Sequence, residues 1–114
     1  MNNCIFCRIA DKTLPSAIVF ENDRILAFRD AKPEAPVHIL IIPKKHIERI
    51  TDIGPNEMDL VSQIAVIANQ LARKEKIDQN GFRLVINCNK DGGQTVFHLH
   101  MHLLGGRILN WPPG

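Results

Sequence analysis

The chain lacks the features that mark membrane and secreted proteins. No apolar stretch approaches the roughly 20 residues that a membrane-spanning helix requires, since the longest run, "ILII" with its flanks, has the length of a strand. The first residues, "MNNCIFCRIADK", show neither the basic start nor the long apolar segment of a signal peptide. Three cysteines do not indicate a disulfide framework in a cytosolic chain. We therefore expect a cytoplasmic protein without a membrane partner.

An excess of charge of one sign is also missing. The chain carries 14 Lys and Arg against 12 Asp and Glu, a formal net charge of +2, and its basic residues are scattered. The only basic cluster, "PKKH", is too short to form a nucleic-acid surface. This mild positive balance suits a small phosphate-bearing ligand better than a nucleic acid.

Size and composition indicate one globular domain. A chain of 114 residues with 45% hydrophobic residues can bury a core, and it shows no repeat, low-complexity tract or linker. We expect residues 1–114 to form a single domain.

Local patterns predict several strands and a short helix. "CIFCRIADK" predicts a short helical piece that ends before Pro15, and "AIVFEND" with "RILAFRD" predicts a hairpin that turns at Asn22 and Asp23. "PVHILIIPKKH" predicts a strand buried on both faces that ends near Pro43. "GFRLVINCN" and "TVFHLHMHLLGG" predict the last two strands, joined by the turn "KDGGQ".

One long helix is predicted in "GPNEMDLVSQIAVIANQLARKEK". Asn56 is a suitable N-cap, and basic residues end the segment. Four apolar residues at helical spacing predict its core face: Leu60, Ile64, Ile67 and Leu71. Together the patterns predict an α+β fold, an antiparallel sheet of about five strands with the helices on one side.

The segment "FHLHMHLLG" places a histidine at every second position. Successive side chains of a strand point to opposite faces, so we expect two sets of residues. His98, His100 and His102 would line one face, while Phe97, Leu99, Met101 and Leu103 would line the other. Such a row of imidazoles suits a metal site or a catalytic site, whereas Lys, Glu or Thr would fill a merely solvated face more readily.

Two further features lie near this row. His38 shares a strand face with Leu40 and Ile42, so it is either part of the site or a core histidine with satisfied hydrogen bonds. The turn "NCNKDGGQT" offers glycines, main-chain N–H groups and polar side chains that could hold an anion beside His100. An ordinary hairpin connection is the alternative for this turn.

The segment from His98 to Leu104 matches the pattern His-φ-His-φ-His-φ-φ at every position. With "RILAFRDAKPEAPVHILIIPKKHI" and "DGGQTVFHLHMHLLGGRILNWPPG", the chain resembles the histidine triad (HIT) nucleotide-binding proteins over nearly its whole length. The endings "LLGG" and "WPPG" are more similar to the purine nucleoside phosphoramidase branch than to the dinucleoside polyphosphate hydrolases.

This resemblance implies a reaction and roles for individual residues. The reaction is hydrolysis of the P–N bond of a purine nucleoside phosphoramidate through a nucleotidyl-histidine. By resemblance, His100 is the nucleophile, His102 contacts the phosphate and helps to protonate the leaving amine, and His38 holds the network in place. The implied binding residues are Asp30 for the ribose, Asn87, Gln94 and Thr95 for the phosphate, and Phe6, Ile9 and Phe28 for the base, although these last three also suit a simple core.

The sequence also suggests a metal. Cys4-x-x-Cys7 is half of a zinc site, or else a pair of small packed thiols. The resemblance to some bacterial members implies that His46 and His98 complete a structural zinc site, which the chemistry itself would not require. Cys88 has no partner in this scheme and reads as a small strand residue.

Two other functions remain open at this point. One is a nucleotide-binding or partner-binding module with vestigial hydrolysis, and the other is a metal-activated phosphohydrolase with His98, His100 and His102 on a catalytic zinc. The resemblance further implies a two-fold homodimer, formed by the long helix and the strand before the histidines, with "WPPG" near the partner's site.

Overall fold

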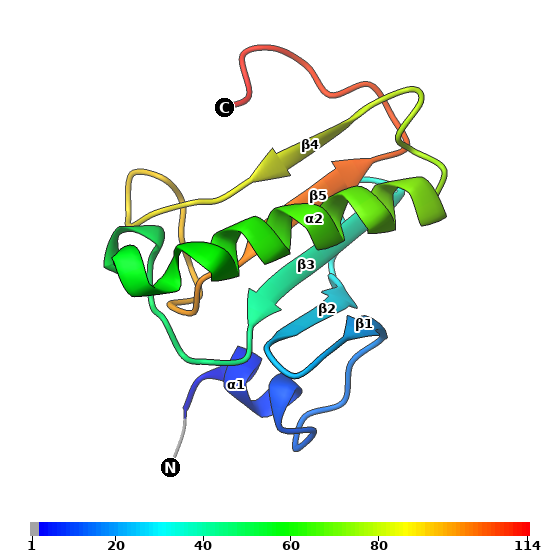
Figure 1. Cartoon of the computed structure of the whole chain (residues 1–114). Helices are drawn as coiled ribbons and strands as arrows, with labels where there is room; N and C mark the ends of the chain where they lie inside the picture. The colour runs from blue at the N-terminus through cyan, green and yellow to red at the C-terminus, as the bar shows by residue number, and fades with distance from the viewer. Residues whose placement is uncertain (1–2) are drawn as a thin grey trace.

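Five antiparallel strands form one sheet in the order β1-β2-β3-β5-β4 (Figure 1). The structure is a computed structural model and describes residues 3–114. The elements are α1 (Ile5–Ala10), β1 (Ile18–Glu21), β2 (Ile25–Arg29), β3 (Val37–Pro43), the 3₁₀ turns η1 (Ile50–Asp52) and η2 (Pro55–Glu57), α2 (Met58–Lys74), β4 (Phe82–Val85) and β5 (Met101–Gly105). The predicted α+β class and the antiparallel sheet of five strands are confirmed. None of the helices among residues 3–114 is long and apolar enough to cross a membrane.

The first hairpin and the central strand follow the sequence closely. The Asn22 side chain closes the β1–β2 turn, because its Oδ1 accepts from the N–H groups of Arg24 and Ile25 at 2.9 and 2.8 Å. Strand β3 lies between β2 and β5, and all seven of its residues are buried. The predicted hairpin and the strand buried on both faces are therefore confirmed.

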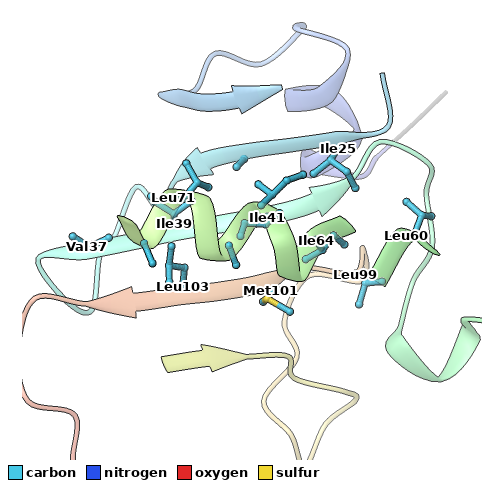
Figure 2. Packing of buried hydrophobic residues seen from close by; sticks show 14 of the residues in the cluster. Ile25, Val37, Ile39, Ile41, Leu60, Ile64, Leu71, Leu99, Met101 and Leu103 are labelled. Carbon is cyan, nitrogen blue, oxygen red and sulfur yellow. The ribbon is translucent and has the colours of Figure 1, made fainter. Parts of the chain in front are cut away.

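Helix α2 covers one face of the sheet (Figures 1 and 2). The four predicted residues of its apolar face are all buried in one cluster with Ile39, Ile41 and Leu103 of the strands. The predicted N-cap is wrong. Pro55 begins a 3₁₀ turn that contains Asn56, so α2 starts only at Met58, after Glu57.

The opposite face of the sheet carries α1. Phe6 and Ile9 of α1 pack in a second cluster with Leu26, Phe28, Leu40 and Ile42, which alternate along β2 and β3 with the residues facing α2. Because β2 and β3 are apolar on both faces, both faces need a cover. The expectation that the helices share one side is therefore wrong for α1.

The last two strands are shorter than predicted. Strand β5 begins only at Met101, because the segment before it runs beside residues 46–48, where the Leu99 N–H donates to the Ile47 carbonyl at 2.6 Å. Leu99, Met101 and Leu103 all pack under α2 as expected, but Phe97 is 42% exposed and does not join them. Strand β4 ends at Val85, so Cys88 lies in the following loop, not in a strand as expected, with its Sγ 3.8 Å from the Thr51 hydroxyl oxygen.

Candidate active site and metal cluster

One ring nitrogen of His100 is hydrogen-bonded to the main chain, and the other lies on the opposite side of the ring. Its Nδ1 donates to the His98 carbonyl at 2.7 Å, so the hydrogen of the neutral ring is on Nδ1 and Nε2 carries a lone pair. The residue is 7% exposed, and the Phe6 ring meets it edge-on at 5.1 Å between centroids. Burial lowers the pKa of His100, so the ring is neutral near pH 7. A neutral, oriented imidazole of this kind can act as a nucleophile.

A chain of hydrogen bonds fixes the tautomers of His38 and His102. The Glu34 N–H donates to His38 Nδ1 at 3.0 Å, which places the His38 hydrogen on Nε2. His38 Nε2 then donates to His102 Nδ1 at 2.9 Å, which places the His102 hydrogen on Nε2. Among residues 3–114, no protein group pairs with His102 Nε2, although that atom is buried. His102 thus offers an N–H donor beside His100, with the two ring centroids 4.9 Å apart.

Burial keeps His38 and His102 neutral. Desolvation, with the neighbouring His100 and His38 rings, lowers the pKa of His102 from 6.5 to about 4. Desolvation also lowers the pKa of His38, and the charge of Asp30 opposes the shift without reversing it. Near pH 7 both rings therefore keep the tautomers that their hydrogen bonds select.

Asp30 lies beside these two histidines. Its Oδ2 is 3.4 Å from His38 Nε2, and its Oδ1 accepts from the Lys32 N–H at 2.9 Å. Asp30, His38 and His102 bring three potential ligand atoms within 4.8 Å of one another. A ligating histidine donates its other N–H outward, whereas His38 accepts the Glu34 N–H there and keeps its hydrogen on the inner nitrogen. This cluster therefore suits a proton relay better than a metal.

A second cluster has the opposite hydrogen-bond pattern. His98 Nε2 donates to the Pro43 carbonyl at 2.7 Å, which leaves its Nδ1 lone pair toward Cys4, Cys7 and His46. This outward N–H to a carbonyl is the arrangement that orients a metal-ligating histidine. Cys4 caps α1, and its Sγ accepts from the Cys7 N–H at 3.3 Å, so the helix start places both sulfurs on one side.

The spacing of these four atoms fits tetrahedral zinc. Zn–S distances of about 2.3 Å and Zn–N distances of about 2.0–2.1 Å give tetrahedral edges of about 3.6 Å between sulfur and nitrogen and about 3.3 Å between two nitrogens. Cys4 Sγ and Cys7 Sγ lie 3.3 and 3.5 Å from His98 Nδ1, and Cys7 Sγ lies 3.2 Å from His46 Nδ1. The two Nδ1 atoms are 3.2 Å apart. Both the donor set and its dimensions fit this metal.

The three histidines of the motif do not converge on one point. His98 belongs to the cysteine cluster and His102 to the group with Asp30, while His100 is in neither set of potential ligands among the described residues. A catalytic zinc held by these three histidines together is therefore not what the structure provides.

The loop before the histidine segment is held from inside. The Gln94 side chain is buried: its Oε1 accepts from the Asn89 N–H at 2.9 Å, and its Nε2 donates to the carbonyls of Glu48 and Val96 at 2.8 and 3.1 Å. Both of its amide hydrogens are used, so a phosphate contact by Gln94 would require one bond to open. Asn87 is half-buried and Thr95 is exposed.

Gly92 is needed in this loop because the chain passes close to itself. A Cβ atom at Gly92 would come 2.6 Å from the Cys88 carbonyl oxygen. Three main-chain N–H groups of the loop, those of Asn89, Gly93 and Gln94, are bonded within it. Fewer of them therefore face outward than the sequence alone led us to expect.

The three apolar residues expected at the base are buried, and one of them, Phe6, lies beside His100. Phe6, Ile9 and Phe28 are each at most 7% exposed, and the Phe6 and Phe28 rings stand edge to face at 5.4 Å. All three contribute to the core of the α1 face, and Phe6 also contacts the His100 ring. A role in base binding stays a prediction.

The sequence analysis missed the groups that set the tautomers. The Glu34 N–H, the Pro43 carbonyl and the His98 carbonyl are all main-chain atoms. Every residue type except proline carries both groups, so no residue type could have indicated them.

Comparison with known proteins finds one family and the same fold in solved structures. The HIT domain family matches residues 11–109. An uncharacterised HIT-like protein from Synechocystis sp. is 46% identical over 110 residues, which cover 96% of each chain. The crystal structure of a HIT family hydrolase from Legionella pneumophila is 52% identical, with a TM-score of 0.97 over 98% of this chain and 100% of that one. A Zn-bound histidine triad family protein from Mycobacterium smegmatis is 32% identical, with a TM-score of 0.80 over 92% of this chain and 76% of that one.

Proposed function

Because this chain belongs to the HIT family, we propose that it is a hydrolase that cleaves the P–N bond of purine nucleoside 5′-phosphoramidates such as adenosine 5′-monophosphoramidate. The products would be a nucleoside monophosphate and an amine. One observation carries the proposal: the lone pair of His100 Nε2 lies beside a buried N–H of His102 that no described residue accepts. A nucleophile and a donor for a phosphoryl oxygen thus stand side by side, and the match to the phosphoramidase branch rests on "LLGG" and "WPPG".

The reaction proceeds in two displacements at phosphorus. His100 Nε2 attacks the α-phosphorus, the P–N bond to the amine breaks, and a nucleotidyl-histidine forms. His102 Nε2–H bonds to the phosphoryl group and passes its proton to the departing nitrogen as the P–N bond breaks, with His38 holding its ring; the water that attacks in the second step returns a proton to His102. Water then attacks the same phosphorus and displaces His100. Overall one water is consumed: its hydroxyl goes to phosphorus and its hydrogen to the amine.

The proposed substrate contacts follow from the resemblance to the family. Asp30 binds the ribose hydroxyls, Asn87 and Thr95 contact phosphate oxygens, and the edges of Phe6, Ile9 and Phe28 form the wall against the purine. Gln94 shapes the loop and reaches the phosphate only if one of its main-chain bonds opens.

The covalent step gives the test. Rapid quench of the enzyme with adenosine 5′-monophosphoramidate should yield a nucleotidyl adduct on His100 by mass spectrometry. A chiral phosphorothioate analogue should be hydrolysed with retention of configuration, because two in-line displacements restore it. Inversion without an adduct would instead indicate direct attack by water. Tight nucleotide binding with neither adduct nor turnover would indicate a binding module with vestigial hydrolysis.

Cys4, Cys7, His46 and His98 hold a structural zinc ion in this proposal. A site with four protein ligands leaves no position for a reacting water, so the metal would stabilise the fold and would not take part in the chemistry. The dimensions of the cluster and the Zn-bound mycobacterial relative support this assignment. Elemental analysis of protein purified without added metal should find one zinc per chain. Fully folded protein that contains no zinc would refute the assignment.

A two-fold homodimer is the proposed assembly. Strand β4 is at the edge of the sheet and exposes Leu84, while Met58 and Val66 of α2 are exposed as well. A second copy of the chain that pairs with this open sheet edge would cover these apolar side chains. Light scattering coupled to size exclusion should give twice the chain mass, and a monomer at micromolar concentration would contradict it.

A further inference from the structure

Arg107 lies two residues beyond β5 and contacts the turn between β2 and β3. Its Nε and Nη2 both donate to the Glu34 carbonyl, at 3.2 and 2.9 Å, and its Nη1 donates to the Ile108 carbonyl at 2.9 Å. These bonds join two segments that are 73 residues apart in the chain. The guanidinium thus fixes the position of one specific peptide group in an otherwise exposed turn.

The same residue, Glu34, also contacts the active site through its other main-chain group. Its N–H donates to His38 Nδ1 at 3.0 Å. The turn also packs closely against the segment after β5 at Gly106. This glycine has a φ of +92°, and a Cβ atom added to it would come 2.9 Å from the Pro36 Cβ. The carbonyl of Glu34 is therefore tied to Arg107 while its N–H is tied to His38.

We propose that Arg107 is a positioning residue that holds the Glu34 N–H on His38 and so selects the tautomers of the His38–His102 pair. This inference rests on the proposed function for its kinetic consequence, but not for its structural one. The hydrogen bonds of the Arg107 side chain go to the main-chain carbonyls of Glu34 and Ile108 and not to the histidines. Arg107 acts through the Glu34 main chain and two imidazoles.

Loss of this hold has a defined chemical effect. Without the Glu34 N–H, His38 Nδ1 can carry the hydrogen, and the Asp30 carboxylate, 3.4 Å from His38 Nε2, is the remaining group that favours the present tautomer. A His38 ring with its hydrogen on Nδ1 has a lone pair on Nε2. That lone pair faces the lone pair of His102 Nδ1, 2.9 Å away. His102 then relieves the repulsion by moving its hydrogen to Nδ1, and the N–H beside His100 is lost. His100 keeps its tautomer, because its own bond goes to the His98 carbonyl.

The test compares three variants of the full chain. Arg107→Gln removes the two-pronged contact with the Glu34 carbonyl, and Arg107→Lys keeps one donor. Arg83→Gln is the matched control, because Arg83 Nη2 also donates to carbonyls of the C-terminal segment, those of Leu109 and Asn110 at 3.3 and 3.0 Å. Arg107→Gln and Arg83→Gln thus both loosen the C-terminal segment, but only Arg107→Gln loses the contact with Glu34.

The readout is the ring ¹⁵N chemical shift of each histidine, which reports the nitrogen that carries the hydrogen. In Arg107→Gln, His38 and His102 should shift toward the opposite tautomers while His100 stays unchanged. With the phosphoramidate, kcat should fall about fivefold, the scale of one net hydrogen bond, with little change in KM. Arg107→Lys should restore part of both effects, and Arg83→Gln should leave the ¹⁵N shifts of His38 and His102 as they are.

Wild-type ¹⁵N shifts for His38 and His102 in folded Arg107→Gln would overturn the positioning role. Equal changes in Arg83→Gln would overturn it too, since they would come from the C-terminal segment in general. If Arg107→Gln does not fold, Arg107→Lys decides by the same shifts. Failure of the wild type to hydrolyse phosphoramidates would refute the proposed function, whereas the ¹⁵N shifts would still decide the role of Arg107.

Discussion

Mild acid should destabilise the protein through His102. The pKa of this ring is lowered from 6.5 to about 4, chiefly by burial, so the unfolded chain binds a proton between these pH values that the folded chain does not. The stabilising contribution is therefore complete above about pH 6.5 and is lost as the pH falls toward 4. The full shift corresponds to about 3 kcal/mol, of which roughly 2 kcal/mol is lost between pH 7.5 and pH 5.

The assay is urea unfolding of the wild type and of His102→Asn at pH 7.5 and at pH 5. Asparagine keeps an acceptor near the position of Nδ1, so the His38 Nε2–H retains a partner, but it cannot titrate. Subtracting the two proteins cancels the contributions of His98, whose pKa is also lowered to about 4 by burial, and of the carboxylates. We expect the wild type to lose roughly 2 kcal/mol more than the variant over this interval.

The comparison concerns only the pH dependence, not the absolute stability of the variant. A uniform loss of stability in His102→Asn at both pH values is compatible with the reasoning. If the two proteins lost the same free energy of unfolding between pH 7.5 and pH 5, His102 would not be the buried neutral ring described above.

Three shorter predictions concern the nucleophile, the metal cluster and the loop. His100→Ala should abolish turnover while nucleotide binding by calorimetry survives, and near-normal turnover would remove its assignment as nucleophile. Cys4→Ser with Cys7→Ser should lose the bound zinc and melt earlier yet keep measurable activity, whereas inactivation by a chelator in a protein that stays folded would favour a catalytic metal. Gly92→Ala should destabilise the protein by about 1–3 kcal/mol in urea unfolding, since its Cβ would meet the Cys88 carbonyl at 2.6 Å; unchanged stability would show that the loop adjusts freely.

Sequence reasoning was most successful where neighbouring residues decide the structure. The Asn22 turn, the buried strand β3 and the apolar face of α2 each depend on a few residues in a row, and all three were predicted. The alternation around Leu99 and Met101 also held, since a locally extended chain alternates its side chains even outside a ladder.

It failed where distant segments decide. The first half of "TVFHLHMHLLGG" has a good strand pattern, but its partner is the short segment around Ile47 and not another strand. Phe97 is exposed and stands beside the Arg49 guanidinium, whose carbon lies 5.7 Å from the ring centroid, so its environment also comes from another part of the chain. Side-chain chemistry could be predicted from the sequence, whereas the contacts of Glu34 and Arg107 required the fold.

The bond from His100 to the carbonyl of residue 98 has a bearing on how this protein can evolve. A carbonyl is present whatever side chain stands at position 98, so the orientation of the proposed nucleophile depends on the path of the chain and is insensitive to substitution there. Mutations that remove the cysteine cluster, or rebuild it with other ligands, therefore need not change the position of His100 Nε2. Under the proposed function, lineages could gain or discard the proposed zinc while selection on the proposed catalysis keeps His100 unchanged, and the two features could diverge at separate rates.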